Sequence, residues 1–232
     1  MILGVIGGMG PLATCNFFEK IIRLTDADKD QEHIHIIIDN NTSIPDRTDY
    51  ILGHGKDPRP ELIKSAIKLE SMGADYIAIP CNTAHYFYED IVKYIDVKII
   101  NMIEETAMYI SKACSEHRDY LLLSTEGTYK SEIYKKVFEK HGLRIIEPSD
   151  EDKKTIMGWI YGVKSSVFNV TSQEFEAFVN KYIENKSIPV ILGCTELSTL
   201  AEKIDLRLKY VDPLLILAKR CVELHQIASC NE

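Results

Sequence analysis

Short apolar runs alternate with amphipathic stretches along the whole chain. The runs have the length of buried strands, and the stretches between them repeat their apolar residues with the period of a helix. Because strands and helices follow one another singly, the pattern predicts an α/β fold of parallel sheets with helices on both faces. The expected strands lie near residues 2–6, 33–38, 75–79, 98–100, 119–124, 143–147, 188–192 and 208–211. The expected helices span 11–24, 58–72, 83–95, 102–116, 129–141, 171–185, 195–203 and 213–228.

Prolines and glycines support several of these helix boundaries. Pro11 and Pro213 suit the first turn of a helix, where a backbone N–H has no intrahelical partner to lose. Gly73 and Gly142 suit the position just after a helix, where the backbone commonly turns left-handed.

The two halves of the chain repeat the same order of elements. Each half opens with an apolar strand and a polar or glycine-rich turn, continues with a second strand, and closes on a strand followed by a cysteine, Cys81 or Cys194. This echo predicts two similar parallel-sheet α/β lobes related by pseudo-twofold symmetry, with the active site in the cleft between them. The expected N-terminal lobe comprises residues 1–97 plus 210–232, and the C-terminal lobe comprises 98–209.

The last helix and residues 40–60 allow two further predictions. The last helix is expected to return to the first lobe, which would otherwise be short. Residues 40–60 are rich in Asn, Gly and Pro. A loop of that length in a compact domain is more often functional than incidental.

Composition restricts the partners. The 232 residues carry 27 basic and 35 acidic side chains, a formal charge of −8, and include no basic run. We therefore expect no nucleic-acid partner and no membrane partner. The N-terminus lacks a signal-peptide pattern, and the six cysteines show no disulfide-framework spacing. Free thiols and a cytoplasmic location are the expectation.

Two cysteines stand out by their positions. Cys81 and Cys194 each follow a buried-looking strand and precede a helix-like stretch. Ligands of open parallel sheets bind at the carboxyl ends of the strands. Backbone N–H groups and the dipole of a following helix lower the pKa of a thiol placed there. Two such thiols suggest acid/base groups that face each other across the cleft, whereas the other four cysteines suit ordinary packing or termini.

The glycine-rich turn at residues 7–10 can present N–H groups to a carboxylate or phosphate. It does not match the dinucleotide-binding pattern, because Ala13 occupies the place of the third glycine. Contact with a substrate carboxylate and simple close packing both remain open for Met9 and Gly10.

Several polar residues are open to two interpretations. Arg47 could clamp a carboxylate or pair with Asp46 or Asp49 in its own loop. Lys164 could bind a ligand or be solvated. Thr125 and Thr128 could donate hydroxyl groups to a ligand or cap a helix.

A metal site is not expected. Cys81, His85 and Cys194 lack an apparent fourth ligand for a structural zinc. His85 is expected on the helix after Cys81, where it packs or assists the thiol. Glu196 could bind a substrate ammonium group or orient the thiol of Cys194.

Together these motifs resemble the aspartate/glutamate racemase family of cofactor-independent amino-acid racemases. The resemblance covers essentially the whole chain, and five motifs in this order are a specific signature. The motifs are Ile6-Gly7-Gly8-Met9-Gly10-Pro11, Asn41-Thr42-Ser43-Ile44-Pro45-Asp46-Arg47, Pro80-Cys81-Asn82-Thr83-Ala84-His85, Ser124-Thr125-Glu126-Gly127-Thr128 and Gly193-Cys194-Thr195-Glu196-Leu197.

The resemblance implies a role for each matching position. Cys81 and Cys194 correspond to the two bases that remove and return the α-proton, and Arg47 and Lys164 to the residues that bind the distal carboxylate. The α-carboxylate and amine would be held near Met9, Gly10, Asn82, Thr83, Thr125, Thr195 and Glu196. It further implies an acidic amino acid as substrate, no cofactor, no metal and a homodimer.

Two alternatives remain. A related cysteine-dependent isomerase, of the maleate isomerase type, would use a cysteine as a nucleophile. A non-catalytic dicarboxylate-binding protein would keep the fold without the chemistry. The sequence does not choose between aspartate and glutamate, because one methylene is discriminated by only ~1–3 kcal/mol.

Overall fold

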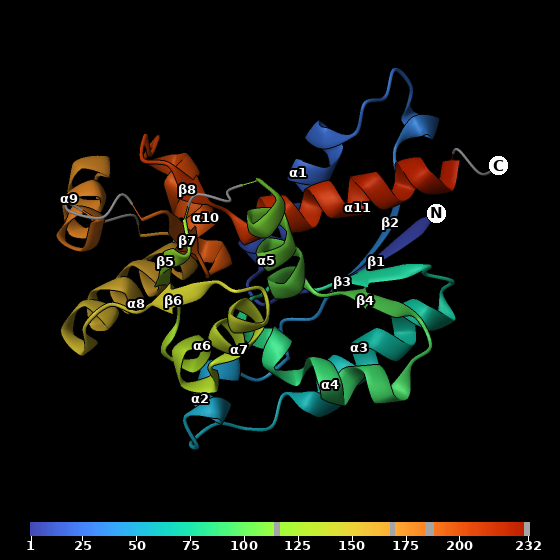
Figure 1. Cartoon of the computed structure of the whole chain (residues 1–232). Helices are drawn as coiled ribbons and strands as arrows, with labels where there is room; N and C mark the ends of the chain where they lie inside the picture. Colours follow the sequence, from blue (N-terminus) through green and yellow to red (C-terminus); the bar gives the residue numbers. More distant parts are fainter. Residues whose placement is uncertain (114–116, 168–169, 184–187, 230–232) are drawn as a thin grey trace.

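The computed structural model describes residues 1–113, 117–167, 170–183 and 188–229. The chain forms two four-stranded sheets, each wholly parallel and flanked by helices (Figure 1). The first sheet has the order β2-β1-β3-β4 and the second the order β6-β5-β7-β8. Corresponding strands therefore occupy corresponding places, and the predicted α/β fold with two similar lobes is confirmed.

All eight predicted strands are present in the described residues. In the first sheet they are β1 (Ile2–Gly7), β2 (His35–Asn40), β3 (Tyr76–Ala78) and β4 (Lys98–Ile100). In the second they are β5 (Asp119–Leu123), β6 (Arg144–Ile146), β7 (Val190–Leu192) and β8 (Tyr210–Val211). The helices are α1 (Pro11–Leu24), α2 (Arg47–Ile51), α3 (Arg59–Ser71), α4 (Tyr88–Ile91), α5 (Met102–Ala113), α6 (Glu126–Ser131), α7 (Ile133–Lys140), α8 (Asp150–Lys164), α9 (Ser172–Ile183), α10 (Thr195–Lys203) and α11 (Pro213–Ser229). Three short 3-10 helices are η1 (Asp30–Glu32), η2 (Thr83–Phe87) and η3 (Val92–Tyr94).

Two of the predicted helices need correction, and two further helices were missed. The expected helix 83–95 is instead the succession η2, α4 and η3. The expected helix 129–141 is two helices, α6 and α7, separated at Glu132, whose φ is 56°. Helices α2 and α8 were not predicted. Gly73 and Gly142 do have positive φ, 86° and 71°, as expected of residues that end a helix.

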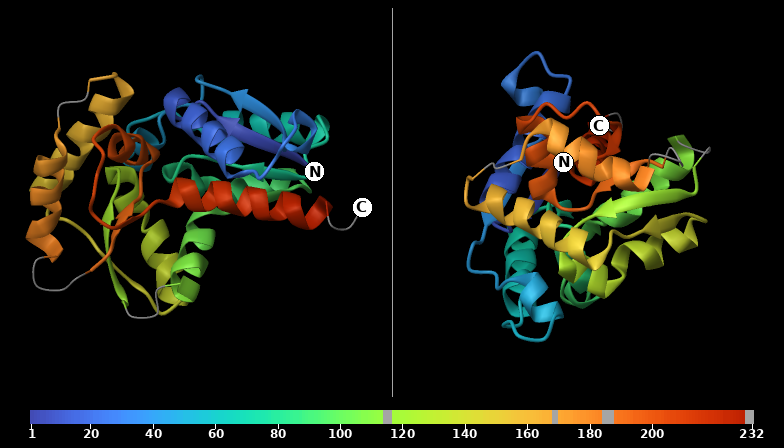
Figure 2. Two further views of the ribbon diagram at one scale, coloured as in Figure 1. Left: turned by 90° about the horizontal axis from the view of Figure 1, so that it is seen from above. Right: turned by 90° about the vertical axis from the view of Figure 1, so that its left-hand side faces the viewer.

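Each sheet is buried between two helical layers. In the first lobe, Leu3 and Val5 of β1 pack on one face with Phe17 of α1, and α3 covers the other face. In the second lobe, α8, α9 and α10 cover one face, whereas α5 and α7 cover the other. Figure 2 shows the two layered units side by side.

The last helix, α11, packs on the first sheet rather than the second. Leu214, Leu217 and Cys221 belong to the same buried cluster as Leu3 and Phe17. Strand β4 pairs with β3 in the first sheet, and β8 pairs with β7 in the second. The expected boundaries were 97/98 and 209/210. Strand β4 begins just after the first and β8 just after the second. The division into two lobes with those bounds stays a prediction.

Among the described residues, no helix is both long and apolar enough to cross a membrane.

Candidate active site

Cys81 and Cys194 follow the equivalent strands of the two sheets. Cys81 comes after β3 and Cys194 after β7, each the strand that lies third in its sheet. Both side chains are 6 % exposed. Cys194 is the N-cap of α10, and Cys81 lies just before η2. The pseudo-symmetric fold therefore gives each lobe one buried thiol at the carboxyl end of its sheet.

Glu196 holds the thiol of Cys194. The Sγ atom donates to Oε2 of Glu196 at 2.9 Å. Burial raises the pKa of Cys194 well above its usual value; the negative charge of Glu196 raises it further, and Lys164 opposes the shift. The expectation that its helix N-terminus would lower the pKa is therefore wrong for Cys194, because burial and a neighbouring carboxylate outweigh the helix dipole. Cys194 is a protonated thiol at neutral pH.

Thr195 and the glycine-rich turn complete the surroundings of Glu196. The hydroxyl of Thr195 donates to Oε2 of Glu196 at 3.3 Å. A Cβ placed on Gly10 would lie 3.3 Å from Oε1 of the same carboxylate. The turn before α1 therefore packs closely against Glu196 at Gly10, which has no side chain.

A cavity of about 420 Å³ lies between this turn and the second lobe. It is lined from the first lobe by residues 8–13, Thr42 and Arg47, and from the second by Val163, Lys164, Ser166, Glu196 and Thr199. The cavity thus brings together five residues expected at the site: Met9, Gly10, Arg47, Lys164 and Glu196. The other expected residues, among them both thiols, are buried and are not part of its lining.

Arg47 is a buried cation on the wall of this cavity. It is 8 % exposed, and one terminal nitrogen donates to the backbone oxygens of Ile44 at 3.3 Å and Pro45 at 3.0 Å. Its buried Nε has no hydrogen-bond partner. Asp46 instead accepts from the backbone N–H of Asp49 as the N-cap of α2. Within the described residues, no carboxylate is paired with Arg47.

Lys164 reaches the cavity from the last turn of α8. Its side chain is exposed, and Nζ lies 5.4 Å from the ring centroid of Tyr161. Partial burial of the ammonium group lowers the pKa of Lys164, but the negative charge of Glu196, together with that of Cys194 when it is ionised, outweighs this effect and raises the pKa. The ammonium group therefore remains charged beside the second thiol.

Three threonine hydroxyls meet where the lobes touch. Thr83, after Cys81, lies 3.0 Å from the hydroxyl oxygens of both Thr125 and Thr128 in the second lobe. Those two hydroxyls are also 3.0 Å apart, and Thr125 caps α6 by accepting from the N–H of Thr128. Thr125 therefore serves as a cap and as part of a cluster of hydroxyl donors.

Asn82 lies between Cys81 and Thr83 and is 2 % exposed. Its Oδ1 accepts a hydrogen bond from Tyr134, and its Nδ2 has no partner. Thr128 and Tyr134 thus join the site. No pattern in the sequence singles out Tyr134, because the packing of α7 against the other lobe brings it there.

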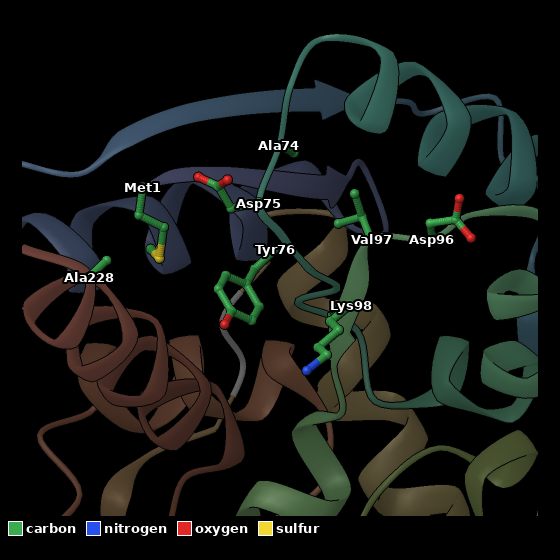
Figure 3. A pocket seen from close by; sticks show the side chains of 8 residues that line it. All are labelled: Met1, Ala74, Asp75, Tyr76, Asp96, Val97, Lys98 and Ala228. Atoms are coloured by element: carbon green, nitrogen blue, oxygen red, sulfur yellow. The ribbon is translucent and has the colours of Figure 1, made fainter. Parts of the chain in front are cut away.

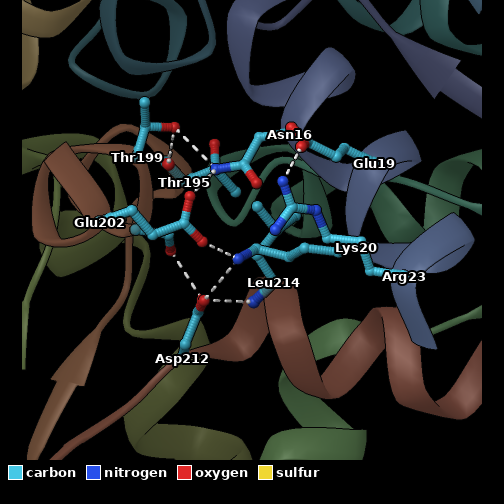
Figure 4. A network of polar contacts seen from close by, with 10 residues as sticks. Asn16, Glu19, Lys20, Arg23, Thr195, Thr199, Glu202, Asp212 and Leu214 are labelled. Carbon is cyan, nitrogen blue, oxygen red and sulfur yellow. Dashed lines mark hydrogen bonds and ion pairs between the residues drawn. The ribbon is translucent and has the colours of Figure 1, made fainter.

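A polar network connects α1 with α10 (Figure 4). Asn16 donates to Thr199, whose hydroxyl in turn donates to the backbone oxygen of Thr195. Lys20 pairs with Glu202 and lies 3.8 Å from Asp212. The helix whose first turn carries Thr195 and Glu196 is therefore fixed to the first lobe along its length.

A larger hollow, of about 640 Å³, lies at the opposite end of the first sheet (Figure 3). Asp75, Tyr76, Asp96 and Lys98 contribute its polar groups. It contains neither thiol. The described residues include no group of three or more His, Cys, Asp or Glu side chains arranged to hold a metal ion.

Comparison with known proteins agrees with this geometry. A model of the Asp/Glu/hydantoin racemase family matches residues 6–221. The chain therefore belongs to the Asp/Glu/hydantoin racemase family, and as a member of a racemase family it is an isomerase.

Individual relatives span nearly the whole chain. The broad specificity amino-acid racemase RacX of Bacillus subtilis is 30% identical over 224 residues, which are 95% of this chain and 96% of that protein. The structure of Picrophilus torridus aspartate racemase is similar with a TM-score of 0.82 and 31% identity, covering 97% of this chain and 94% of that one. A glutamate racemase from Francisella tularensis shares the fold, with a TM-score of 0.67 at 20% identity over 98% of this chain and 81% of that one.

Proposed function

We propose that this protein is a cofactor-independent amino-acid racemase that interconverts the L and D forms of aspartate or glutamate by proton transfer between two cysteines. The main support is the equivalent placement of Cys81 and Cys194 after β3 and β7 of two pseudo-symmetric sheets. One thiolate removes the α-proton, and the opposed thiol donates a proton to the other face of the planar carbanion.

The bond between Cys194 and Glu196 supports two roles for this thiol. As a protonated group, Cys194 can donate a proton to the carbanion directly. To act as the base it must first lose its proton, and the carboxylate oxygen of Glu196, 2.9 Å from Sγ, is placed to accept it. The ammonium group of Lys164 lowers the cost of the resulting thiolate. Acid–base positioning of this kind contributes roughly 10²–10⁴ in rate.

Stabilisation of the carbanion requires hydrogen-bond donors at the α-carboxylate, which gains negative charge as the proton leaves. The free Nδ2 of Asn82 and the hydroxyls of Thr83 and Thr125 are donors next to Cys81. Thr195 extends the set on the side of Cys194. We assign the α-carboxylate to this cluster and the ammonium group to Glu196, with Met9 and Gly10 closing the pocket.

The distal carboxylate of the substrate is assigned to Arg47 and Lys164. A buried guanidinium that lacks a carboxylate partner is costly unless a ligand supplies one. The relatives named above include an aspartate racemase and a broad specificity racemase. The unpaired Arg47 favours an acidic amino acid as the preferred substrate of this chain.

The test is incubation of the purified protein in D₂O with L-aspartate and, separately, L-glutamate, L-alanine and L-lysine. D-product that carries deuterium at the α-carbon, measured by chiral chromatography and proton NMR, supports the proposal. Cys81→Ser and Cys194→Ser should each abolish racemisation, whereas Cys221→Ser, at a buried position in the core of the first lobe, serves as the matched control.

Three other outcomes would contradict the proposal. A covalent adduct without α-proton exchange would indicate a nucleophilic cysteine, as in an isomerase of the maleate type. Tight binding of aspartate without exchange at any pH would indicate a dicarboxylate-binding protein. Racemisation of neutral and basic amino acids at rates equal to aspartate would remove the preference assigned to Arg47.

We also propose a homodimer, supported by the outward face of α1. Leu12, Cys15, Phe18 and Ile22 recur every three or four residues and are all exposed. A helix that is apolar on its outward face as well as on its buried face typically packs against another protein chain. Light scattering should give a dimer for the wild type and a monomer for Phe18→Glu. The control is Met72→Glu, at an exposed position at the C-terminal end of α3.

A cytoplasmic location remains a prediction from the cysteine pattern.

A further inference from the structure

Tyr134 of α7 is a fully buried tyrosine whose hydroxyl crosses to the other lobe. Its side chain is 1 % exposed and packs with Phe138, its ring 5.5 Å away. The hydroxyl lies 2.5 Å from Oδ1 of Asn82 and donates to it. A second-lobe side chain is thereby bonded to the residue that directly follows Cys81.

This bond determines which way the amide of Asn82 faces. With Oδ1 bonded to Tyr134, the Nδ2 group is directed elsewhere, and it has no hydrogen-bond partner although it is buried. Reversing the amide would turn its N–H toward the tyrosine oxygen and leave the buried hydroxyl proton without this acceptor. Either orientation leaves one buried donor without an acceptor, at a cost of about 1–3 kcal/mol. In the observed orientation that donor is Nδ2, which the carboxylate of a ligand can satisfy.

The phenol remains a donor at every working pH. Burial raises the pKa of Tyr134 well above its usual value, and the negative charges of Asp212 and of a Cys194 thiolate raise it further. Tyr134 is therefore joined to the site through Asn82.

We propose that Tyr134 is a positioning residue that fixes the Asn82 amide with its free N–H directed at the substrate's α-carboxylate. The inference rests on the proposed function for the identity of the ligand. The α-carboxylate is the appropriate acceptor because Asn82 is adjacent to Cys81, whereas the distal carboxylate is assigned to Arg47 on the wall of the cavity. The α-carboxylate gains charge in the transition state, so loss of this orientation affects the chemical step more than ground-state binding.

Kinetics of four variants test the role. Tyr134→Phe keeps the ring but removes the hydroxyl, and we expect kcat for L-aspartate to fall about 10- to 100-fold with less than about a threefold change in KM. The matched control is Tyr120→Phe, another fully buried tyrosine of the same cluster, whose hydroxyl bonds the backbone of His117. It should leave kcat within about twofold.

The double variant Tyr134→Phe/Asn82→Ala separates positioning from a structural effect. If Tyr134 acts through Asn82, the double variant is no slower than Asn82→Ala alone. Multiplied losses in the double variant, or an effect on KM with kcat unchanged, would overturn the proposal.

A measurement that needs no turnover keeps this inference distinct from the proposed function. In ¹⁵N-labelled protein, Asn82→Ala identifies the side-chain NH₂ signals of Asn82. The wild type should show two sharp, widely separated proton signals that move when succinate, a dicarboxylate without an amine, is added. In Tyr134→Phe these signals should broaden or converge. If the two Asn82 signals are the same in Tyr134→Phe as in the wild type, the role of Tyr134 is refuted, even if the protein racemises aspartate. Because the signals are measured without turnover, they test this role even if the wild type is inactive.

Discussion

The imidazole of His85 is bonded to the backbone of Cys81, with Nδ1 2.9 Å from the carbonyl oxygen. Its other nitrogen, Nε2, accepts from the N–H of Met102 at the start of α5. Since Nε2 must accept, Nδ1 carries the proton and donates it to Cys81. His85 was expected to pack or to assist the thiol, and its polar contact is instead with the peptide backbone. It fixes the turn that carries Cys81 to the first residue of α5.

Protonation of His85 should destabilise the protein in acid. Burial lowers the pKa of His85 from its usual value of 6.5 to about 4. The unfolded chain therefore binds more protons than the folded chain between these values, and stability falls as the pH is lowered from about 6.5 to about 4. We expect this group alone to reduce the free energy of unfolding by about 2–3 kcal/mol between pH 7 and pH 4.5.

Urea unfolding, followed by fluorescence of the single tryptophan Trp159, measures this difference at the two pH values. His85→Gln should lower stability at pH 7 but lose that part of the acid dependence. The exposed His54, replaced by Gln, is the control and should retain the wild-type drop. Equal drops in wild type and His85→Gln would contradict the assignment.

Glu196 and Lys164 should move the thiol of Cys194 in opposite directions. Because the carboxylate raises the pKa of Cys194 and the ammonium group lowers it, Glu196→Gln should lower that pKa and Lys164→Gln should raise it. Alkylation of Cys194 by iodoacetamide, resolved by mass spectrometry across a pH series, reports the thiolate fraction. Shifts of the same sign in both variants would be incompatible with the described contacts.

Arg47 should set the preference for a second carboxylate. Replacing it by Gln removes the buried charge, and KM for L-aspartate should rise about 10- to 100-fold, the effect of one lost hydrogen bond to a charged group. For L-alanine, which has no distal carboxylate, KM should change less than about threefold. Initial racemisation rates over a range of substrate concentrations give both values. Equal losses for the two substrates would show that Arg47 only supports its loop through Ile44 and Pro45.

Lys20 should stabilise the junction between α1 and α10. Its side chain is 12% exposed and lies beside Asp212. Burial raises the pKa of Asp212 despite the hydrogen bond from Ser198 and the positive charge of Lys20, which both lower it. Lys20→Met leaves the buried carboxylate without its cation, so the free energy of unfolding should fall by about 1–3 kcal/mol. Arg23→Met breaks an exposed pair on the same helix and should cost at most about 0.5 kcal/mol.

Urea unfolding of both variants provides the comparison. Since Lys20 also holds the helix that begins at Thr195, we expect kcat to fall in Lys20→Met and not in Arg23→Met. A smaller loss of stability in Lys20→Met than in Arg23→Met would mean that the network in Figure 4 contributes nothing to the lobe junction.

The strands were predictable from sequence because each is a short apolar run between polar turns. Helix α8 was missed, although its start carries a recognisable signal: Ser149 accepts from the N–H of Asp152, and three acidic residues fill the first turn. Gly158 and Gly162 within it weaken the helical pattern. The interruption after Cys81, by contrast, depends on tertiary packing around η2, for which local sequence carries no signal.

The sequence predicted which residues belong to the site, but only part of how they contact one another. Arg47, Lys164 and Glu196 do line one cavity with Met9 and Gly10. The bond of Tyr134 to Asn82 and the meeting of Thr83 with Thr128 arise where two lobes dock. Such contacts join residues far apart in sequence, and the pattern of apolar positions describes only one lobe at a time.

The return of α11 to the first sheet has a consequence for the order of folding. Leu214 and Leu217 complete the buried layer that covers Leu3 and Phe17. These late residues leave the ribosome only after the entire second sheet has been synthesised. Until then α1 covers this face of the earliest strands only in part, and completing the layer requires contacts of very high sequence separation, which form slowly. The second sheet, built from one uninterrupted stretch of chain, is free to fold first.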